Sequence, residues 1–185
     1  MHYTTLNKIR SLSPSIYSFG KLLNHLGKTK ADDDPISMKV ILDSNGIDDA
    51  IWCIRALDKQ SAVGFAIYCA EKVLPIFEKE YPDDDRPRKA IEAAKNINIS
   101  PDAVAAAADA YADAAYAADY ASYSDADYAA AFAAAAAHAA SAAAAVDSVD
   151  AAFSANAAVI AADAAANLAG LNITRQSVFE QYFCQ

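Results

Sequence analysis

The side chains best suited to chemistry in this sequence are clustered carboxylates, three histidines and three cysteines. Two acidic runs, Asp32–Asp34 and Asp83–Asp85, lie just ahead of prolines and have the composition of a cation site. Neither run has the glycine turn or the distal glutamate of a calcium loop. Acids ahead of a helix also complement its dipole, which is the interpretation we favour. Because the histidines are scattered and no cysteines pair closely, the sequence predicts neither a metal nor a cofactor.

Nucleophilic catalysis needs a nucleophile, a base and an orienting group, and no such set is visible in the sequence. His138 lies inside a run of alanines, and no glycine-rich phosphate loop is present. The cysteines Cys53, Cys69 and Cys184 are odd in number and far apart, which is typical of reduced, buried thiols. We therefore predict a protein of the reducing cytoplasm that is not an enzyme.

One group of residues mixes an aromatic ring with charges of both signs. Trp52 and Arg55 share a helix face at i, i+3, and Glu71 interrupts an otherwise apolar helix. Together with Arg86 and Arg88 they favour a structural Arg–Glu pair beneath the tryptophan. The alternative is a pocket for a small molecule, either a binder or a hydrolase.

A second group forms a stripe of carboxylates and phenols. On a helical wheel, five residues of 102–120 share one face: Asp102, Asp109, Asp113, Tyr116 and Tyr120. Further carboxylates accompany the stripe at Asp119, Asp125 and Asp127. A face that only confers solubility normally mixes lysine with its acids, and this one has no base. We therefore predict that these eight residues contact a partner.

The distribution of charge supports that interpretation. Residues 1–100 carry fourteen bases and fourteen acids, whereas residues 101–185 carry ten acids and one base, Arg175. The net charge of −9 thus belongs to the second half. Such a field repels nucleic acid and attracts cationic proteins, so we expect a basic protein partner and no direct contact with DNA or RNA. We also keep the formation of a homo-oligomer as an open alternative.

The residues of the first half fall into helical patterns marked by prolines and glycines. Prolines at Pro14, Pro35, Pro87 and Pro101 predict helix starts, with Ser13, Asp34 and Ser100 as caps. Gly27, Gly46 and Gly170 predict helix ends. Apolar stripes predict helices through Ile16–Leu26, from Ile36, through Ile47–Leu57 and through Val63–Phe77. Ile36–Leu42 also suits a strand, which we discount because no second strand is evident.

The second half is built largely of alanine, which makes up thirty-eight of residues 101–170. Alanine has the highest helix propensity, and its small side chain lets helices approach closely. We expect two or three long antiparallel helices here, with breaks near residues 122–125 and 147–150 and with Val159 and Ile160 among the core residues. A last helix follows from about Thr174 to Phe183. The sequence therefore predicts an all-α multi-helix bundle in a single domain, residues 1–185.

Nothing in the sequence favours secretion or a membrane. Residues 1–10 lack the apolar core of a secretory signal. The longest uncharged run, residues 128–146, has the length of a membrane span but is mostly alanine, which gains little from lipid.

Three segments in order resemble a family of immunity proteins proposed in bacterial polymorphic-toxin systems and also found in phages. They are Ser44–Arg55 (SNGIDDAIWCIR), Tyr68–Glu78 (YCAEKVLPIFE) and Asp84–Ala94 (DDRPRKAIEAA), and the likeness extends over roughly residues 36–170. An alanine-rich helical tail follows in that family too. The resemblance implies an all-helical, non-enzymatic protein that neutralises a toxin or effector by binding it, and it supplies no catalytic residues.

These observations lead to one expected function and two alternatives. We expect a binding protein that covers a basic surface of a toxin, nuclease or defence effector with its acidic helices. The first alternative is a phage-encoded anti-defence inhibitor that imitates the charge of nucleic acid. The second is a small-molecule binder or hydrolase with a pocket near Trp52, Arg55, Glu71 and Arg86.

Overall fold

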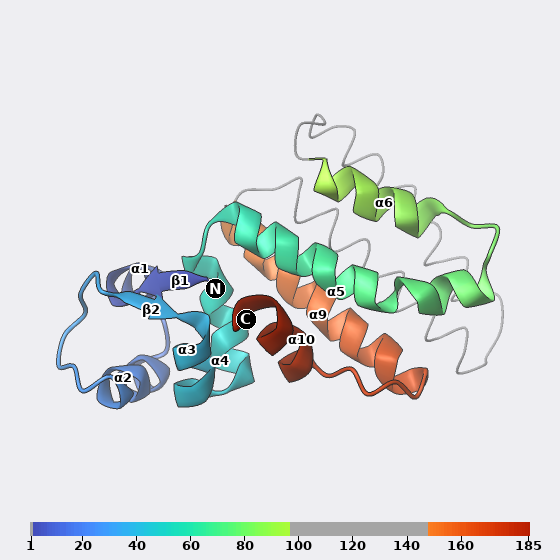
Figure 1. Ribbon diagram of the computed structural model, residues 1–185. Coiled ribbons are helices and arrows are strands. Elements are labelled where there is room, and N and C mark those ends of the chain that lie inside the picture. Colours follow the sequence, from blue (N-terminus) through green and yellow to red (C-terminus); the bar gives the residue numbers. More distant parts are fainter. Residues whose placement is uncertain (1, 97–147) are drawn as a thin grey trace.

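The computed structural model describes residues 2–96 and 148–185, and these are mostly helical, as predicted (Figure 1). The elements in chain order are β1 (Tyr3–Thr5), α1 (Leu6–Ser11), α2 (Ile16–His25), β2 (Pro35–Ser37), α3 (Met38–Asn45), α4 (Ile47–Trp52), the 3-10 helix η1 (Cys53–Ala56), α5 (Lys59–Glu80), α6 (Arg86–Lys95), α9 (Ser148–Leu168) and α10 (Arg175–Phe183). The predicted contact face at Asp102, Asp109, Asp113, Tyr116, Asp119, Tyr120, Asp125 and Asp127 lies outside the described residues.

Helices α5 and α9 lie side by side and form the most extensive contact in the described chain (Figure 1). They run in the same direction, since their carboxyl ends border one shared hollow. Both helices bury small residues at three- and four-residue steps; those of α9 include Ala155, Ala158, Val159, Ala162 and Ala165, and those of α5 include Ala62, Ala66, Ala70 and Val73. Small side chains allow the two backbones to approach closely, which is the role expected of the alanines.

Helix α10 closes the core with aromatic rings. Phe179 and Phe183 are fully buried against Phe65 of α5, with ring centroids 5.9 and 4.9 Å away. Its first turn is held by a capping box between Thr174 and Ser177, so the predicted helix from Thr174 to Phe183 is confirmed. His2 stacks on Tyr182 at 5.3 Å, which ties the start of the chain to its last helix.

The N-terminal part contains a small sheet that the sequence analysis did not predict. β1 and β2 pair antiparallel, with Tyr3 opposite Ser37 and Thr4 opposite Ile36. Discounting a strand at Ile36 was therefore wrong, and Pro35 lies in that strand instead of opening a helix. Three-residue strands are too short to display an alternating pattern, which is why β1 escaped notice.

Several helix boundaries also differ from the prediction, whereas the glycine stops agree with it. The caps of α2 and α3 are Ser15 and Ser37, not Ser13 and Asp34. Backbone φ angles of 65°, 93° and 68° at Gly27, Gly46 and Gly170 confirm the predicted helix ends. Ser100 and Pro101 lie outside the described residues.

The predicted apolar stripe on α2 is wrong at its first member. Ile16 is 93% exposed and Tyr17 is 80% exposed, whereas Leu22 is buried. The packed face follows Ser15, Ser18, Phe19 and Leu22, so a residue one step after Ser15 points away. Ile160 of α9 is likewise half exposed rather than part of the core.

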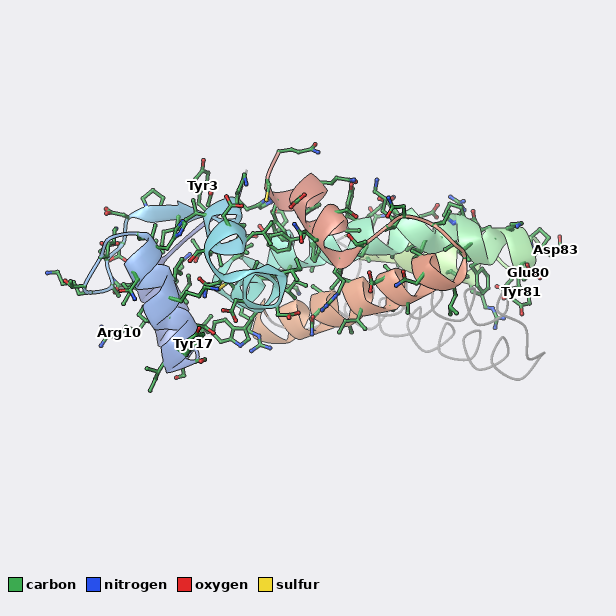
Figure 2. The ribbon with its side chains drawn as sticks, turned by 90° about the horizontal axis from the view of Figure 1, so that it is seen from below. Tyr3, Arg10, Tyr17, Glu80, Tyr81 and Asp83 are labelled. Atoms are coloured by element: carbon green, nitrogen blue, oxygen red, sulfur yellow. The ribbon has the colours of Figure 1, made fainter. Side chains whose placement is uncertain are left out.

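The described part of the molecule is elongated (Figure 2). Figure 2 shows Tyr3, Arg10 and Tyr17 at the end formed by β1, α1 and α2, and Glu80, Tyr81 and Asp83 at the opposite end. Among the helices described, none combines the length and the apolar character that crossing a membrane requires.

A glycine in the middle of α5 provides a test of the packing. A Cβ at Gly64 would lie 2.1 Å from Oη of Tyr182. The tyrosine cannot easily move, because its ring contacts His2, Phe65, Tyr68 and Phe183. We expect Gly64→Ala to lower the free energy of unfolding by about 1–3 kcal/mol, despite the helix propensity of alanine. Thermal and urea unfolding measure this change.

Gly20→Ala is the matched control, because Gly20 is also inside a helix but a Cβ at that position would have no neighbour within 4 Å. It should raise stability by about 0.4–1 kcal/mol. Adding Tyr182→Phe to Gly64→Ala removes the clashing oxygen and should restore most of the loss. Equal effects of the two glycine substitutions would contradict this account of the packing.

Candidate functional site

The turn between α3 and α4 holds a network of short polar contacts. Asn45 donates through Nδ2 to the carbonyl of Ser18 at 2.8 Å and to Oδ2 of Asp49 at 2.8 Å. Asp49 also accepts from the Ser18 hydroxyl at 3.2 Å, and Ser44 donates to Oδ1 of Asn45 at 2.6 Å. The network fastens α2 to the start of α4, so these residues of the Ser44–Arg55 segment have a structural role.

Local sequence explains how this turn forms. Gly46 takes φ of 93° to end α3, and α4 begins at the next residue. The first turn of α4 carries Asp48 and Asp49, whose charge complements the helix dipole. Successive residues on a helix differ in direction by about 100°, so Asp49 faces α2 while Asp48 faces the other way.

The outward side of the same segment borders a hollow of about 290 Å³, which we name the Trp52 hollow. It lies where α4 and η1 meet α9 and α10, and it is lined by Asp48, Ile51, Trp52, Arg55, Asn156, Ile160 and Arg175. Two of the predicted pocket residues, Trp52 and Arg55, therefore line one hollow.

The charges of the Trp52 hollow are held in defined contacts. The Arg55 guanidinium lies 5.2 Å from the centre of the Trp52 ring, a cation–π distance. Partial burial lowers the pKa of Arg55, although a guanidinium keeps its charge at any physiological pH. Nη1 of Arg175 donates to Asp48 at 3.0 Å and so joins α10 to α4.

Cys53 lies on the side of the segment that faces α2 and is buried. Burial and the nearby Asp49 carboxylate raise the pKa of its thiol to about 12. Burial also raises the pKa of Cys69. Because the thiolate is the nucleophilic form, neither cysteine is activated for catalysis.

The predicted Arg–Glu pair beneath the tryptophan is wrong. Glu71 is exposed and pairs with Lys95 of α6 at 2.6 Å. Arg86 pairs with Asp84 at 2.6 Å, and Arg88 pairs with Glu78 at 2.5 Å. The Lys95–Glu71 and Arg88–Glu78 pairs join α6 to α5, and the Arg86–Asp84 pair lies at the start of α6. All three pairs lie away from Trp52 and Arg55. The sequence could not specify these pairings, because each arginine had several acids within reach.

The two acidic runs are engaged in ion pairs. Lys28 contacts Asp32 at 2.6 Å and Asp34 at 2.7 Å, and the Arg86 guanidinium holds the pKa of Asp84 below its usual value. Lys89 contacts Asp85 at 2.8 Å. Within residues 2–96 and 148–185, His, Cys, Asp and Glu side chains form no group of three that could hold a metal ion.

Three polar residues of the Trp52 hollow were not predicted as site residues: Asp48, Asn156 and Arg175. Arg175 did carry a signal, because it is the one base of residues 101–185. An isolated base in an acidic segment is a candidate for a specific contact, and here that contact is Asp48.

The described residues form a mostly helical protein with a mixed-charge hollow where α4, η1, α9 and α10 meet. The family model described as Imm-5 like putative immunity protein matches residues 53–182, and the chain belongs to this family. The match spans α5, α6, α9 and nearly all of α10, and it confirms the resemblance to immunity proteins. Neither the curated proteins nor the solved structures contain a match to the chain.

The Asn45 network generates a prediction about local stability. Asn45→Ala removes two donated hydrogen bonds and leaves the Ser18 carbonyl and Asp49 short of a donor. We expect a loss of about 2 kcal/mol in the free energy of unfolding and faster amide exchange in α2 than in α5. Hydrogen-exchange mass spectrometry resolves the two helices.

Asn24→Ala provides the control, since Asn24 is an exposed asparagine on α2. It should leave exchange in α2 unchanged. A uniform increase of exchange across α2, α5 and α9 after Asn45→Ala would show that the network does not act locally.

Proposed function

We propose that this protein is an immunity-type inhibitor that neutralises a toxin or effector by covering its basic surface with the acidic face of residues 102–127. The proposal assigns contact roles to Asp102, Asp109, Asp113, Tyr116, Asp119, Tyr120, Asp125 and Asp127. It places the action in the cytoplasm of a bacterial cell and involves binding rather than catalysis.

The observation that carries the proposal is that residues 101–185 of this member of an immunity protein family bear many negative charges and almost no positive ones. Residues 101–185 hold ten carboxylates and one base, and that base is engaged with Asp48 from the first half. In the first half, by contrast, ion pairs such as Lys39–Asp43 and Lys95–Glu71 balance the charges. An unbalanced acidic surface costs self-repulsion, which a basic partner relieves on binding.

Electrostatic complementarity chiefly raises the association rate and selects partners. An inhibitor that must reach a toxin before the toxin reaches its target gains from such steering. Binding through opposite charges also weakens with ionic strength, because the Debye length falls from about 10 Å at 0.1 M to about 3 Å at 1 M. The exposed tyrosines expected on this face would add apolar anchor contacts.

The test begins by identifying the partner through affinity capture from the native host and mass spectrometry. The dissociation constant of that partner is then measured for the wild type and for a triple variant, Asp109→Lys, Asp113→Lys and Asp119→Lys. We expect binding to weaken about tenfold or more, since like charges across an interface cost several kcal/mol. Rescue of growth in cells that express the partner should fail in parallel.

A second triple variant supplies the same change of charge outside the alanine-rich half: Asp33→Lys, Asp83→Lys and Glu92→Lys. All three of these carboxylates are exposed. Circular dichroism should show native helicity for both variants. Equal weakening by the two variants, or an affinity unaffected by added salt, would refute the specific role of the acidic face. A partner from host defence encoded away from any toxin gene would favour the anti-defence alternative.

A further inference from the structure

The Trp52 hollow combines aromatic, charged and apolar side chains. Among its described lining residues are two guanidinium groups, one carboxylate, an indole and the half-exposed Ile160. Tryptophan and arginine are the residues most enriched where binding energy concentrates in protein interfaces. The hollow is assembled from segments far apart in the chain, since Asp48 and Arg175 are separated by 127 residues.

We propose that the Trp52 hollow receives one acidic side chain of the partner protein, with its carboxylate on Arg175 and its stem against Trp52 and Ile160. This inference rests on the proposed function in that its occupant belongs to a protein partner, but it uses the described residues of α4, η1, α9 and α10 and not the proposed contact face at residues 102–127. It assigns a binding site to a different part of the chain.

The geometry of Arg175 suits an exchangeable anion site. Its side chain is 37% exposed and that of Asp48 is 81% exposed, so their ion pair lies at the edge of solvent. Exposed pairs of this kind contribute little to stability, so exchanging the acid costs little. Asp48 accepts from Nη1, and the guanidinium fork presents five N–H donors, enough for a second carboxylate.

The surroundings of Arg175 are also favourable for an anion. The second guanidinium of the hollow, Arg55, is held over the Trp52 ring and adds positive potential. The backbone N–H of Arg175 donates to Asp163 at 3.1 Å, which fixes the start of α10 and therefore the base of the arginine side chain. A fixed base reduces the entropy that the side chain loses on binding.

The Trp52 hollow has a volume of about 290 Å³ and is open to solvent at Asp48, so it can take the end of one side chain. Sites for free metabolites usually bury most of the ligand. A nucleic-acid phosphate has suitable charge, but the net charge of −9 repels a polyanion. A single carboxylate on an otherwise basic protein surface has the charge that the arginines attract, and it belongs to a molecule that the net charge of −9 does not repel.

The experiment uses the fact that Trp52 is the single tryptophan of the chain. Trp52 also borders a smaller hollow beside α2, so its fluorescence and its indole N–H resonance report on both hollows, and the Arg175→Gln variant assigns a response to the Trp52 hollow. The full chain is titrated with the N-acetyl amides of glutamate, glutamine and arginine at millimolar concentration. We expect a saturable response to the glutamate probe and at most a weak, linear response to the other two.

Two substitutions of the ion pair should act in opposite directions. Arg175→Gln should weaken binding of the glutamate probe about tenfold or more, the effect expected for hydrogen bonds to a charged group. Asp48→Asn should tighten it several-fold, because the competing carboxylate is gone. Lys39→Gln is the matched control, since Lys39 forms an exposed pair with Asp43 at 2.8 Å, and it should leave binding unchanged.

The opposite effects of the two substitutions on probe binding distinguish a binding role of the Arg175–Asp48 ion pair from a purely structural one. If the ion pair only held α10 to α4, both variants would lower the melting temperature alike and neither would tighten a probe. A response to the arginine or glutamine probe equal to that of glutamate would overturn the proposal, as would unchanged binding by Arg175→Gln. Should Arg175→Gln fail to fold, the Asp48→Asn titration decides. None of these outcomes affects the charge-reversal test of residues 102–127.

Discussion

The close approach of α9 to α5 is the contact on which the described structure depends. Alanine contributes little buried area per residue, so a pair of alanine-faced helices gains stability only if the backbones come near enough for many weak contacts. The α5–α9 contact alone therefore buries little apolar surface. The rings of Phe65, Phe179 and Phe183 add to this buried surface, and each buries far more than an alanine. Helix α10 is therefore a part of the core rather than an appendage.

The Ser44–Arg55 segment, which joins α3, α4 and η1, shows how one short segment can serve two purposes. Asn45 and Asp49 face α2 and hold it through hydrogen bonds, whereas Asp48, Trp52 and Arg55 border the Trp52 hollow. Because neighbouring positions on a helix point in different directions, the same short sequence both fixes its own orientation and presents a surface. The rigidity supplied by the first set benefits the second, since a preorganised site loses less entropy on binding.

Much of the helical architecture could be predicted from sequence because its signals are local. Gly27, Gly46 and Gly170 end helices through a backbone conformation that glycine adopts freely, and the Thr174 cap directly precedes the helix that it stabilises. The sheet of β1 and β2 could not be predicted, because it depends on pairing between segments that carry no alternating pattern. Proline at position 35 suited a strand edge as well as a helix start, and only the tertiary fold decided between them.

In the candidate site too, contacts set by local spacing could be predicted, whereas contacts set by the tertiary fold could not. The i, i+3 spacing of Trp52 and Arg55 was enough to predict that they share a face, and they do form one contact. The partners of Glu71, Arg86 and Arg88 depended on how α5, α6 and the intervening loop are placed, and long charged side chains accept many partners. For the same reason, Asp48 and Arg175 could be identified as a pair only from the fold.

The order of the elements along the chain has a consequence for synthesis in the cell. Tyr68 of α5 donates to Gln181 of α10 at 2.7 Å across a separation of 113 residues. The parallel helix α9 likewise follows α5 by a long stretch of sequence. The part of the α5 face that α9 and α10 cover therefore closes only after residues 148–183 have left the ribosome.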